Sequence, residues 1–278
     1  MKKALEKVLN THELGRSHEH HDDVSSTNDR AMQWISEGAK HGSLVTATAQ
    51  SEGRGRLGRV WDSPRGQGLY ASLILRPESL SVSIASLGLA VGAGIRKGLL
   101  HYAQSVRGRG CKEGALDALR LKWPNDLTFQ GKKMGGILCE ARWNHNVPVL
   151  VVGIGVNLCR RVFPEGLTME AIDLQSACGT EHAPEPAQVL ASLLQALEDV
   201  MGRYFLGGFS AIRAEYEPFC SVLGQWISIS MGSGPHAQGS RMLVKALRLD
   251  PEGALWVQAK EGREFKVEHG DVWLTEKT

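Results

Sequence analysis

The sequence predicts an α+β fold, in which a large domain of mixed strands and helices precedes a small all-β domain. Its 278 residues, of which 42% are hydrophobic, suit one domain of about 200 residues with a smaller partner. Helical and strand-like patterns are intermixed up to about residue 216. Beyond Trp226 the pattern changes to short strands at ~8–12-residue spacing, which is typical of a small sandwich or barrel. We therefore expect one domain over 1–221 and another over 222–278.

Charge and cysteine usage argue against several classes of protein. Lys and Arg number 32 against 30 Asp and Glu, and this near balance argues against bulk electrostatic binding to nucleic acid. Five scattered cysteines without a CxxC pair are typical of reduced thiols rather than a disulfide framework or a zinc site. There is no signal-peptide h-region, and no apolar run reaches the ~18 residues of a membrane helix. The expectation is a cytoplasmic protein without membrane contact.

The first 22 residues are interpreted as an N-terminal extension. Met1–Asn10 has helical periodicity. The histidines that follow, at 18, 20 and 21, stand beside two aspartates, and a metal site is one reading of them. Their spacing is not that of a structural zinc site, so we expect a solvated polar linker. Ser25–Asn28 then precedes a helical pattern over 29–38, where a hydroxyl or amide caps the helix.

The chain is organised around residues 51–61, SEGRGRLGRVW, in which Arg54, Arg56 and Arg59 alternate with glycines. Glycine lets a backbone approach a ligand closely, and the arginine fork suits carboxylates and phosphates. Strand-like segments enter this loop at 45–50 and leave it at 68–76. A loop between two strands of one sheet fits an anion-binding active site. A solvated basic loop or an RGG-like nucleic-acid contact are the alternatives.

Two further segments present charged side chains from fixed backbone. In Lys122–Asp126, KWPND, the proline ends a short strand in a turn, and an ordinary β-turn is the alternative. Lys133 begins the next strand, expected over 134–141, beside two glycines. A lysine in this position reaches a buried anion, whereas a plain surface lysine is the alternative. Both segments therefore extend the candidate anion site.

An almost wholly apolar run, 147–157, predicts a strand that is buried on both faces. Its glycines mark close approach of a ligand or another backbone, and the run ends at Asn157. GIGVN lacks the third glycine and the acidic residue of the dinucleotide fingerprint, and no Walker A pattern occurs. A nucleotide would therefore be held in some other way.

The other elements follow from ordinary patterns. The polar loop 107–113, RGRGCKE, is interpreted as a surface insertion, with RNA contact as the alternative. The remaining helices are expected over 83–103, 186–205 and 209–216. The C-terminal strands are expected over 226–230, 242–249, 254–259, 264–268 and 272–274.

Five motifs resemble, in order and spacing, those of the biotin protein ligases. They are Ser26-Thr27-Asn28, Gly53–Arg59 with Trp61, KWPND, GKKMGGIL at 131–138 and GIGVN. The resemblance runs from about Val24 to the C-terminus. It implies a class II synthetase-like mixed sheet with flanking helices, followed by an SH3-like β-barrel. Only about 20 residues precede the first motif. The expectation is therefore a monofunctional ligase without the DNA-binding domain of the repressor branch.

The resemblance also implies an activity and its residues. Biotin and ATP, with Mg²⁺ on the phosphates rather than on side chains, would give biotinyl-5′-AMP and pyrophosphate, and biotin would pass to a lysine of a biotin carboxyl carrier protein. The implied catalytic residues are Lys133, Arg56 and Asp126. The implied biotin contacts are Ser26, Thr27, Asn28, Gln50, Arg54, Gly55, Arg56 and Lys133. The implied nucleotide contacts are Arg54, Arg56, Arg59, Trp61, Lys122 and Asn157.

Three alternatives remain beside this reading. A lipoate ligase would share the fold and the reaction type, a nucleic-acid-binding module would use the two Arg/Gly loops, and a pseudo-enzyme would only bind biotin. The joint presence of GRGRLGR and KWPND favours biotin over lipoate. A homodimer formed through a sheet edge is compatible with the resemblance.

Overall fold

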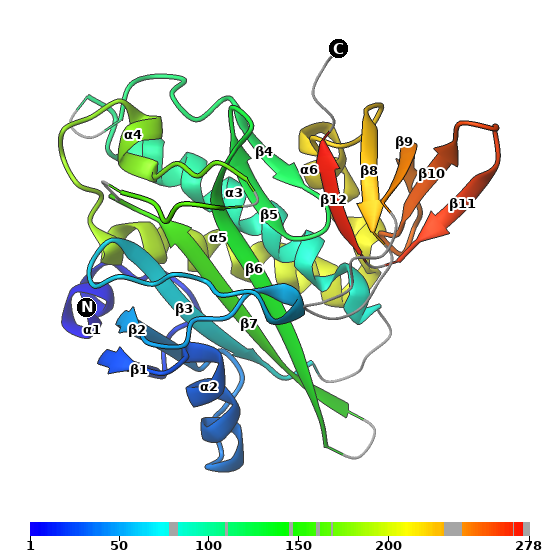
Figure 1. Ribbon diagram of the computed structural model, residues 1–278. Helices are drawn as coiled ribbons and strands as arrows, with labels where there is room; N and C mark the ends of the chain where they lie inside the picture. The colour runs from blue at the N-terminus through cyan, green and yellow to red at the C-terminus, as the bar shows by residue number, and fades with distance from the viewer. Residues whose placement is uncertain are drawn as a thin grey trace.

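The computed structural model describes residues 1–77, 83–108, 111–144, 147–159, 162–167, 169–230, 241–268 and 270–274. A seven-stranded mixed sheet with helices on both faces forms the larger part, and a five-stranded antiparallel sheet stands beside it (Figure 1). Arg109 and Gly110 of the expected surface loop lie outside the described residues. The mixed α/β architecture predicted from the sequence is confirmed.

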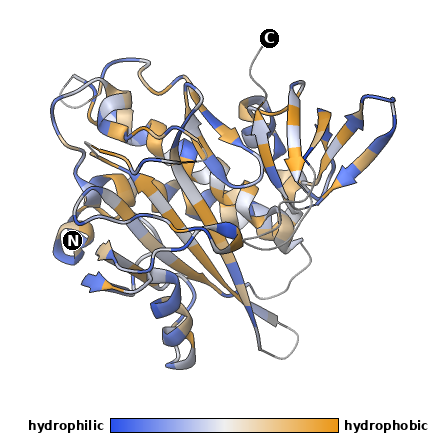
Figure 2. Ribbon diagram, in the orientation of Figure 1, coloured by the Kyte–Doolittle hydropathy of each residue, from blue (hydrophilic) through white to orange (hydrophobic). Residues whose placement is uncertain are grey.

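The large sheet has the order β1-β2-β3-β7-β6-β5-β4, with β1 parallel to β2 and every other pair antiparallel. Apolar residues concentrate along its central strands, whereas the edge strand β1 is largely polar (Figure 2). The strands are β1 (His18–Val24), β2 (Leu44–Gln50), β3 (Gly68–Leu75), β4 (Leu119–Lys122), β5 (Asp126–Phe129), β6 (Lys132–Asn144) and β7 (Val147–Asn157).

One helix covers one face of this sheet, and two long helices cover the other (Figure 1). Gly94 and Gly98 let the two long helices approach each other, because a Cβ on either would lie 2.7 Å from Leu197 or Leu193. The single helix is α2 (Thr27–Ser36), and the pair is α3 (Leu87–Ser105) and α5 (Pro186–Gly207). The remaining helices are α1 (Lys2–Val8), α4 (Leu174–Cys178) and α6 (Arg213–Tyr216).

The expected polar linker around the three histidines is wrong. These residues form the edge strand β1, which pairs in parallel with β2. His18 is only 5% exposed, and its Nε2 lies 2.7 Å from Thr46 Oγ1. The Thr46 hydroxyl gives the buried His18 ring a polar partner. A segment without alternating apolar residues can therefore form the edge strand of this sheet. Helix α1 packs against α5, so this part of the chain is integral to the larger sheet and its helices.

The small sheet has the order β11-β10-β9-β8-β12. Within the described part of the chain, β11 and β12 are its two edges, so an antiparallel sheet is confirmed and a closed barrel is not. Its β9–β10 turn packs on the larger part, where Gly253 O accepts a hydrogen bond from Trp123 Nε1 at 3.2 Å. The strands are β8 (Trp226–Ser230), β9 (Met242–Leu249), β10 (Leu255–Ala259), β11 (Glu264–Val267) and β12 (Asp271–Leu274).

The expectation of reduced thiols is wrong for two of the five cysteines. Cys111 and Cys178 form a disulfide, with their Cα atoms 4.5 Å apart. It ties the segment after α3 to the end of α4, and the partners are 67 positions apart in the sequence. No local spacing could predict a pair that only the fold brings together. No helix in the described ranges has both the length and the apolar character that a bilayer crossing needs.

Candidate active site

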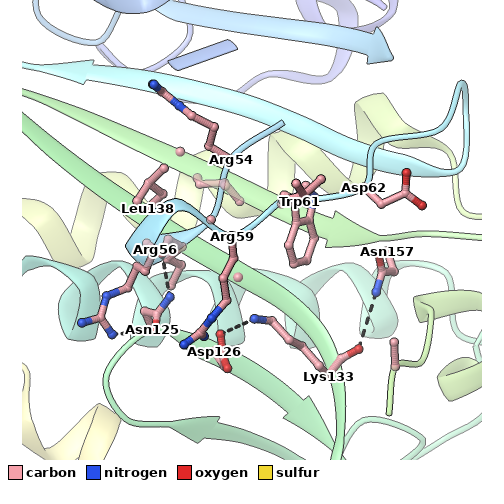
Figure 3. Close-up of a pocket in the computed structure, with 18 of the residues that line it drawn as sticks. Arg54, Arg56, Arg59, Trp61, Asp62, Asn125, Asp126, Lys133, Leu138 and Asn157 are labelled. Carbon is pink, nitrogen blue, oxygen red and sulfur yellow. Dashed lines mark hydrogen bonds and ion pairs between the residues drawn. The ribbon is translucent and has the colours of Figure 1, made fainter. Parts of the chain in front are cut away.

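The structure brings every sequence-predicted site residue to the wall of one cavity of about 200 Å³ (Figure 3). The cavity lies over β6 and β7, beneath the glycine-rich loop. The start of α2, the KWPND turn and β12 complete its wall. The predicted residues are Ser26, Thr27, Asn28, Gln50, Arg54, Gly55, Arg56, Arg59, Trp61, Lys122, Asp126, Lys133 and Asn157.

Two lysines share one carboxylate in this cavity. Lys133 Nζ lies 2.6 Å from Asp126 Oδ1, and Lys122 Nζ lies 4.0 Å from Asp126 Oδ2. Burial lowers the pKa of Lys122, and the nearby Lys133 adds to this effect while Asp126 opposes it. The β4–β5 turn and the start of β6 hold the three groups together. This end of the cavity is therefore fitted for an anion larger than the single carboxylate that it already holds.

The glycine-rich loop folds back over the cavity. Its tip is one 3₁₀ turn, Arg56–Gly58, in which Leu57 adopts a left-handed conformation with φ of 57°. Arg56 Nη1 donates to Asn125 Oδ1 at 3.2 Å and to Gly270 O at 3.3 Å. Burial lowers the pKa of Arg56. The loop thus contacts both the KWPND turn and the small sheet, where Arg59 pairs with Asp271.

The opposite end of the cavity presents uncharged polar side chains from the start of α2 and the end of β2, with Arg54 as their charged neighbour. Gln50 Oε1 accepts from the backbone N–H of Thr27 at 2.8 Å and from its hydroxyl at 3.0 Å. Gln50 Nε2 donates to Ser63 Oγ at 2.8 Å. Ser26 caps α2 by accepting from the N–H of Asp29. These bonds fix the hydroxyl and amide groups before any ligand binds.

Trp61 lies over β6 and β7, at positions where both strands have glycine, so no side chain lies beneath its indole ring. A Cβ on Gly155 would lie 2.5 Å from the indole, and one on Gly136 would lie 3.3 Å from it. The glycines predicted to allow close approach therefore admit Trp61 itself. Its Nε1 is buried without a hydrogen-bond partner in the described part of the chain. Lys133 Nζ lies 5.5 Å from the ring centroid.

Asn157 also lines the cavity, at the end of β7. Its amide Nδ2 donates to Ile172 O at 3.2 Å and lies 3.5 Å from Lys133 O. The side chain therefore fastens the segment around residue 172 to the start of β6. Asn157 supports the backbone that carries Lys133 as well as lining the cavity.

Sequence reasoning missed several residues of this site. Asn125 belongs to the KWPND motif, and the contact with Arg56 explains why an amide follows the proline. Glu140 does not itself line the cavity, but it contacts the lining residues Asn28 and Arg54, and it gave no motif signal. The small sheet contributes Asp271–Trp273 to the cavity wall, and no sequence pattern in the larger part predicts this contact. The segment after β7 adds Phe163, Pro164, Leu167, Met169 and Ala171.

The side chains do not form a metal centre in the described ranges, where no group of three or more His, Cys, Asp or Glu is arranged to hold an ion. Asp126 is already paired with Lys133.

A basic glycine-rich loop folded over a cation-lined cavity on a mixed sheet defines an enzyme-like domain for anionic ligands. Residues 22–157 match the model of the Biotin/lipoate A/B protein ligase family. The bifunctional ligase/repressor BirA of Bacillus subtilis (strain 168) is 31% identical over 269 residues, which cover 96% of this chain and 76% of that protein. The chain therefore belongs to the biotin/lipoate protein ligase family.

Two further relatives lie close to it. The biotin–[acetyl-CoA-carboxylase] ligase of Paracoccus denitrificans is 30% identical over 243 residues, 87% of this chain and 94% of that protein. The solved structure of a biotin protein ligase from Aquifex aeolicus in complex with biotin and ATP superimposes with a TM-score of 0.74 at 26% identity. The match covers 94% of this chain and all of that one, so the likeness includes the small sheet.

Proposed function

We propose that this chain is a biotin protein ligase, which activates biotin with ATP and transfers it to a lysine of a biotin carboxyl carrier protein. One observation carries the proposal: a single cavity joins a lysine-rich end to a polar, uncharged end under an arginine loop. Biotin has the matching polarity, with a ureido ring at one end and a carboxylate at the other. ATP supplies the phosphates for the cationic end.

In the first step a carboxylate oxygen of biotin bonds to the α-phosphorus of ATP. The bond from that phosphorus to its bridging oxygen breaks, and pyrophosphate leaves with the electron pair. Two anions must approach each other, so cations must offset their repulsion. Lys133 and Arg56 have this role, and Lys122 and Arg59 face the departing phosphates. Asp126 orients Lys133 through their 2.6 Å contact.

If Mg²⁺ were bound with the phosphates of ATP, it would supply neutralisation of part of their charge. The side chains described above offer it no dedicated cage. Lys133 and Lys122, which share Asp126, and Arg59, which pairs with Asp271, would offset the rest of the phosphate charge. The ligase should accordingly depend on Mg²⁺ for turnover while binding biotin without it.

In the second step the uncharged amine of the carrier lysine attacks the acyl carbon. The bond from this carbon to the phosphate oxygen breaks, AMP leaves, and the amine nitrogen gives up a proton to solvent. The loop must cover the adenylate until the carrier arrives, because water would hydrolyse the mixed anhydride. The contacts of Arg56 with Asn125 and Gly270 hold the loop in that place.

The polar end of the cavity favours biotin over lipoate as the acid. Thr27 and Gln50 present a hydroxyl and an amide there, with Asn28 beside them. A ureido ring offers two N–H donors and a carbonyl, whereas a dithiolane ring offers none and would leave polar groups facing an apolar ligand. The near balance of charge disfavours a nucleic-acid module, because the 32 Lys and Arg residues are offset by 30 Asp and Glu residues.

Several finer properties belong to the proposal. The small sheet is taken as a variant of an SH3-like barrel, residues 222–278 as its domain and 1–221 as the catalytic domain. The carrier is a subunit of acetyl-CoA carboxylase or a related carboxylase, and the ligase acts in the cytoplasm without binding DNA. The proposal also includes a homodimer that forms through a sheet edge.

Transfer is tested with the purified chain, ATP, Mg²⁺, biotin and a biotin carboxyl carrier protein. Mass spectrometry of the carrier should show one added biotinyl group on one lysine. The matched control is the same carrier with that lysine replaced by arginine, which should stay unmodified. A carrier that gains no biotin under these conditions would refute the proposed function.

A further inference from the structure

The three arginines of the glycine-rich loop do not act as one group. Arg56 and Arg59 point toward Asn125 and Asp126, whereas Arg54 points the opposite way (Figure 3). Arg54 pairs with Asp29 at the start of α2, and its Nη2 also lies 3.6 Å from Glu140 Oε1. Two carboxylates therefore hold the first arginine of the loop away from the lysine-rich end of the cavity.

The second oxygen of Glu140 holds a different residue. Glu140 Oε2 accepts from Asn28 Nδ2 at 2.6 Å, a short distance for a charge-assisted bond. Asn28 is only 4% exposed, and its Oδ1 lies 2.6 Å from Ser72 Oγ. Gly153 leaves room for this arrangement, because a Cβ there would lie 2.4 Å from Asn28 Oδ1. Both ends of the buried amide are thus fixed, and the Glu140 carboxylate, which can only accept, orients the NH2 end of Asn28 toward itself.

The contacts continue into the polar end of the cavity. Ser72 Oγ lies 2.8 Å from Thr27 Oγ1, and Thr27 in turn contacts Gln50. A continuous path of polar contacts therefore runs from the loop to the uncharged end, and Glu140 is where its two halves meet. Removal of the carboxylate would leave Arg54 with Asp29 as its remaining partner. It would also take the short acceptor from the buried Asn28 amide, whose Nδ2 would keep only Leu138 O at 3.5 Å.

We propose that Glu140 is a positioning residue that couples the glycine-rich loop to the polar subsite for biotin. Its Oε2 orients Asn28 and so sets biotin affinity, while its Oε1 holds Arg54 and so keeps the loop over the adenylate. The inference deepens the proposed ligase function and rests on it. Neither effect requires Glu140 to touch the reacting atoms.

A purely structural role would predict something different. The partly exposed Arg54–Glu140 pair contributes little to stability, so its loss would not unfold the protein. A change confined to the melting temperature would follow if Glu140 only stabilised β6. Changes in biotin KM and in adenylate retention, beyond any change in melting temperature, would follow from positioning.

Two substitutions distinguish the role of Glu140 Oε2, which contacts Asn28, from the role of Oε1, which contacts Arg54. Glu140→Gln keeps a carbonyl acceptor for Asn28 but places an uncharged amide near Arg54. Glu140→Ala removes both contacts. Glu52→Gln, which removes one charge from an exposed position at the start of the same loop, is the matched control. Each variant is assayed for biotin-dependent pyrophosphate exchange, for biotinyl-5′-AMP released without carrier, and for its melting temperature.

We expect Glu140→Ala to raise the biotin KM about tenfold, as loss of a charge-assisted hydrogen bond implies, with the ATP KM within about twofold. Glu140→Gln should keep the biotin KM within about threefold of the wild type while releasing adenylate several-fold faster. Adding Glu140→Gln to Arg54→Gln should increase release no further, because the second substitution acts on a contact that the first has already removed. Glu52→Gln should match the wild type in all three assays.

An unchanged biotin KM in Glu140→Ala would overturn the coupling to the subsite, and unchanged adenylate release in Glu140→Gln would overturn the coupling to the loop. If Glu140→Ala fails to fold, Glu140→Asp, whose shorter side chain withdraws the carboxylate from Asn28, tests the coupling to the subsite by the same rise in biotin KM. The Gln variant and its double mutant then decide the coupling to the loop. A wild-type chain without exchange would instead overturn the proposed function itself.

Discussion

Lys133 and Asp126 form an ion pair with an Nζ–Oδ1 distance of 2.6 Å between the start of β6 and the start of β5. Both groups are partly buried, and the second lysine of the cavity, Lys122, approaches the same carboxylate from β4. The pair holds the Lys133 ammonium at the cationic end, beside Trp61. In the proposed reaction this ammonium is the charge nearest the two reacting anions.

Lys133→Ala should lower the rate of biotin-dependent pyrophosphate exchange by about 100-fold or more, because a preorganised charge at the reacting centre is lost. The neighbouring Lys132 is the matched control, since it pairs with Glu170 at the surface, 3.0 Å away. Lys132→Ala should exchange at nearly the wild-type rate. A Lys133→Ala enzyme with near-normal exchange would remove this residue from the mechanism.

Arg56→Gly should release biotinyl-5′-AMP and label proteins indiscriminately. Arg56 is the loop residue that binds both Asn125 and Gly270, so its loss leaves the loop tip unfastened. The measurement is biotin incorporation into a bystander protein, such as serum albumin, with and without carrier. Arg65→Gly serves as the control, because Arg65 pairs with Asp23 outside the cavity wall. Retained carrier selectivity in Arg56→Gly would contradict the assigned role.

Gly155→Ala should raise the ATP KM more than the biotin KM. The added Cβ would lie 2.5 Å from the Trp61 indole, which must move away from the strands beneath it. The two KM values are measured separately in the exchange assay. Gly202→Ala in α5 is the control, because nothing lies within 4 Å of its Cβ position. A variant whose biotin KM rises while its ATP KM does not would show that Trp61 serves the other substrate.

The buried His18 should lower the unfolding free energy in mild acid, because the proton binds more readily to the unfolded chain than to the folded one. Burial lowers its pKa to about 4, and the nearby His20 and Lys2 add to this effect. The unfolded chain binds the proton below about pH 6.5, so stability is lost as the pH falls from about 6.5 toward 4 and is unaffected above this range.

Urea unfolding at about pH 7 and about pH 5 measures this loss. Between these two values the wild type should lose about 2 kcal/mol more of its unfolding free energy than His18→Gln does. Each protein is compared with itself at the two pH values, so any pH-independent effect of the substitution on the unfolding free energy cancels. Equal losses in the two proteins would show that His18 does not titrate as the buried geometry implies.

Most of the fold follows from local pattern. The apolar run that became β7 and the five short strands after Trp226 were predicted to within about two residues at either end, because their hydrophobicity and turns are encoded locally. The edge strand β1 was not, since its polar side chains find partners on β2 that only tertiary pairing supplies. The Cys111–Cys178 disulfide was missed for the same reason.

The residues of the site fall into the same two groups, those that a local motif identifies and those that only the tertiary fold brings together. Residues inside motifs, such as Arg56 and Lys133, could be named because glycine-rich loops and strand starts have recognisable chemistry. Glu140 could not, because its importance comes from Asn28 and Arg54, which lie 112 and 86 positions away in the sequence. Asp271 meets Arg59 only because the small sheet folds against the loop.

The proposed ligase function is tested most directly by biotin-dependent exchange of labelled pyrophosphate into ATP, with lipoate and octanoate in parallel. Exchange with biotin alone is the predicted result, since it reports formation of the biotinyl-adenylate without any carrier. Exchange with lipoate or octanoate but not with biotin would contradict the assignment of the polar end of the cavity. Exchange with none of the three acids would contradict the ligase function altogether.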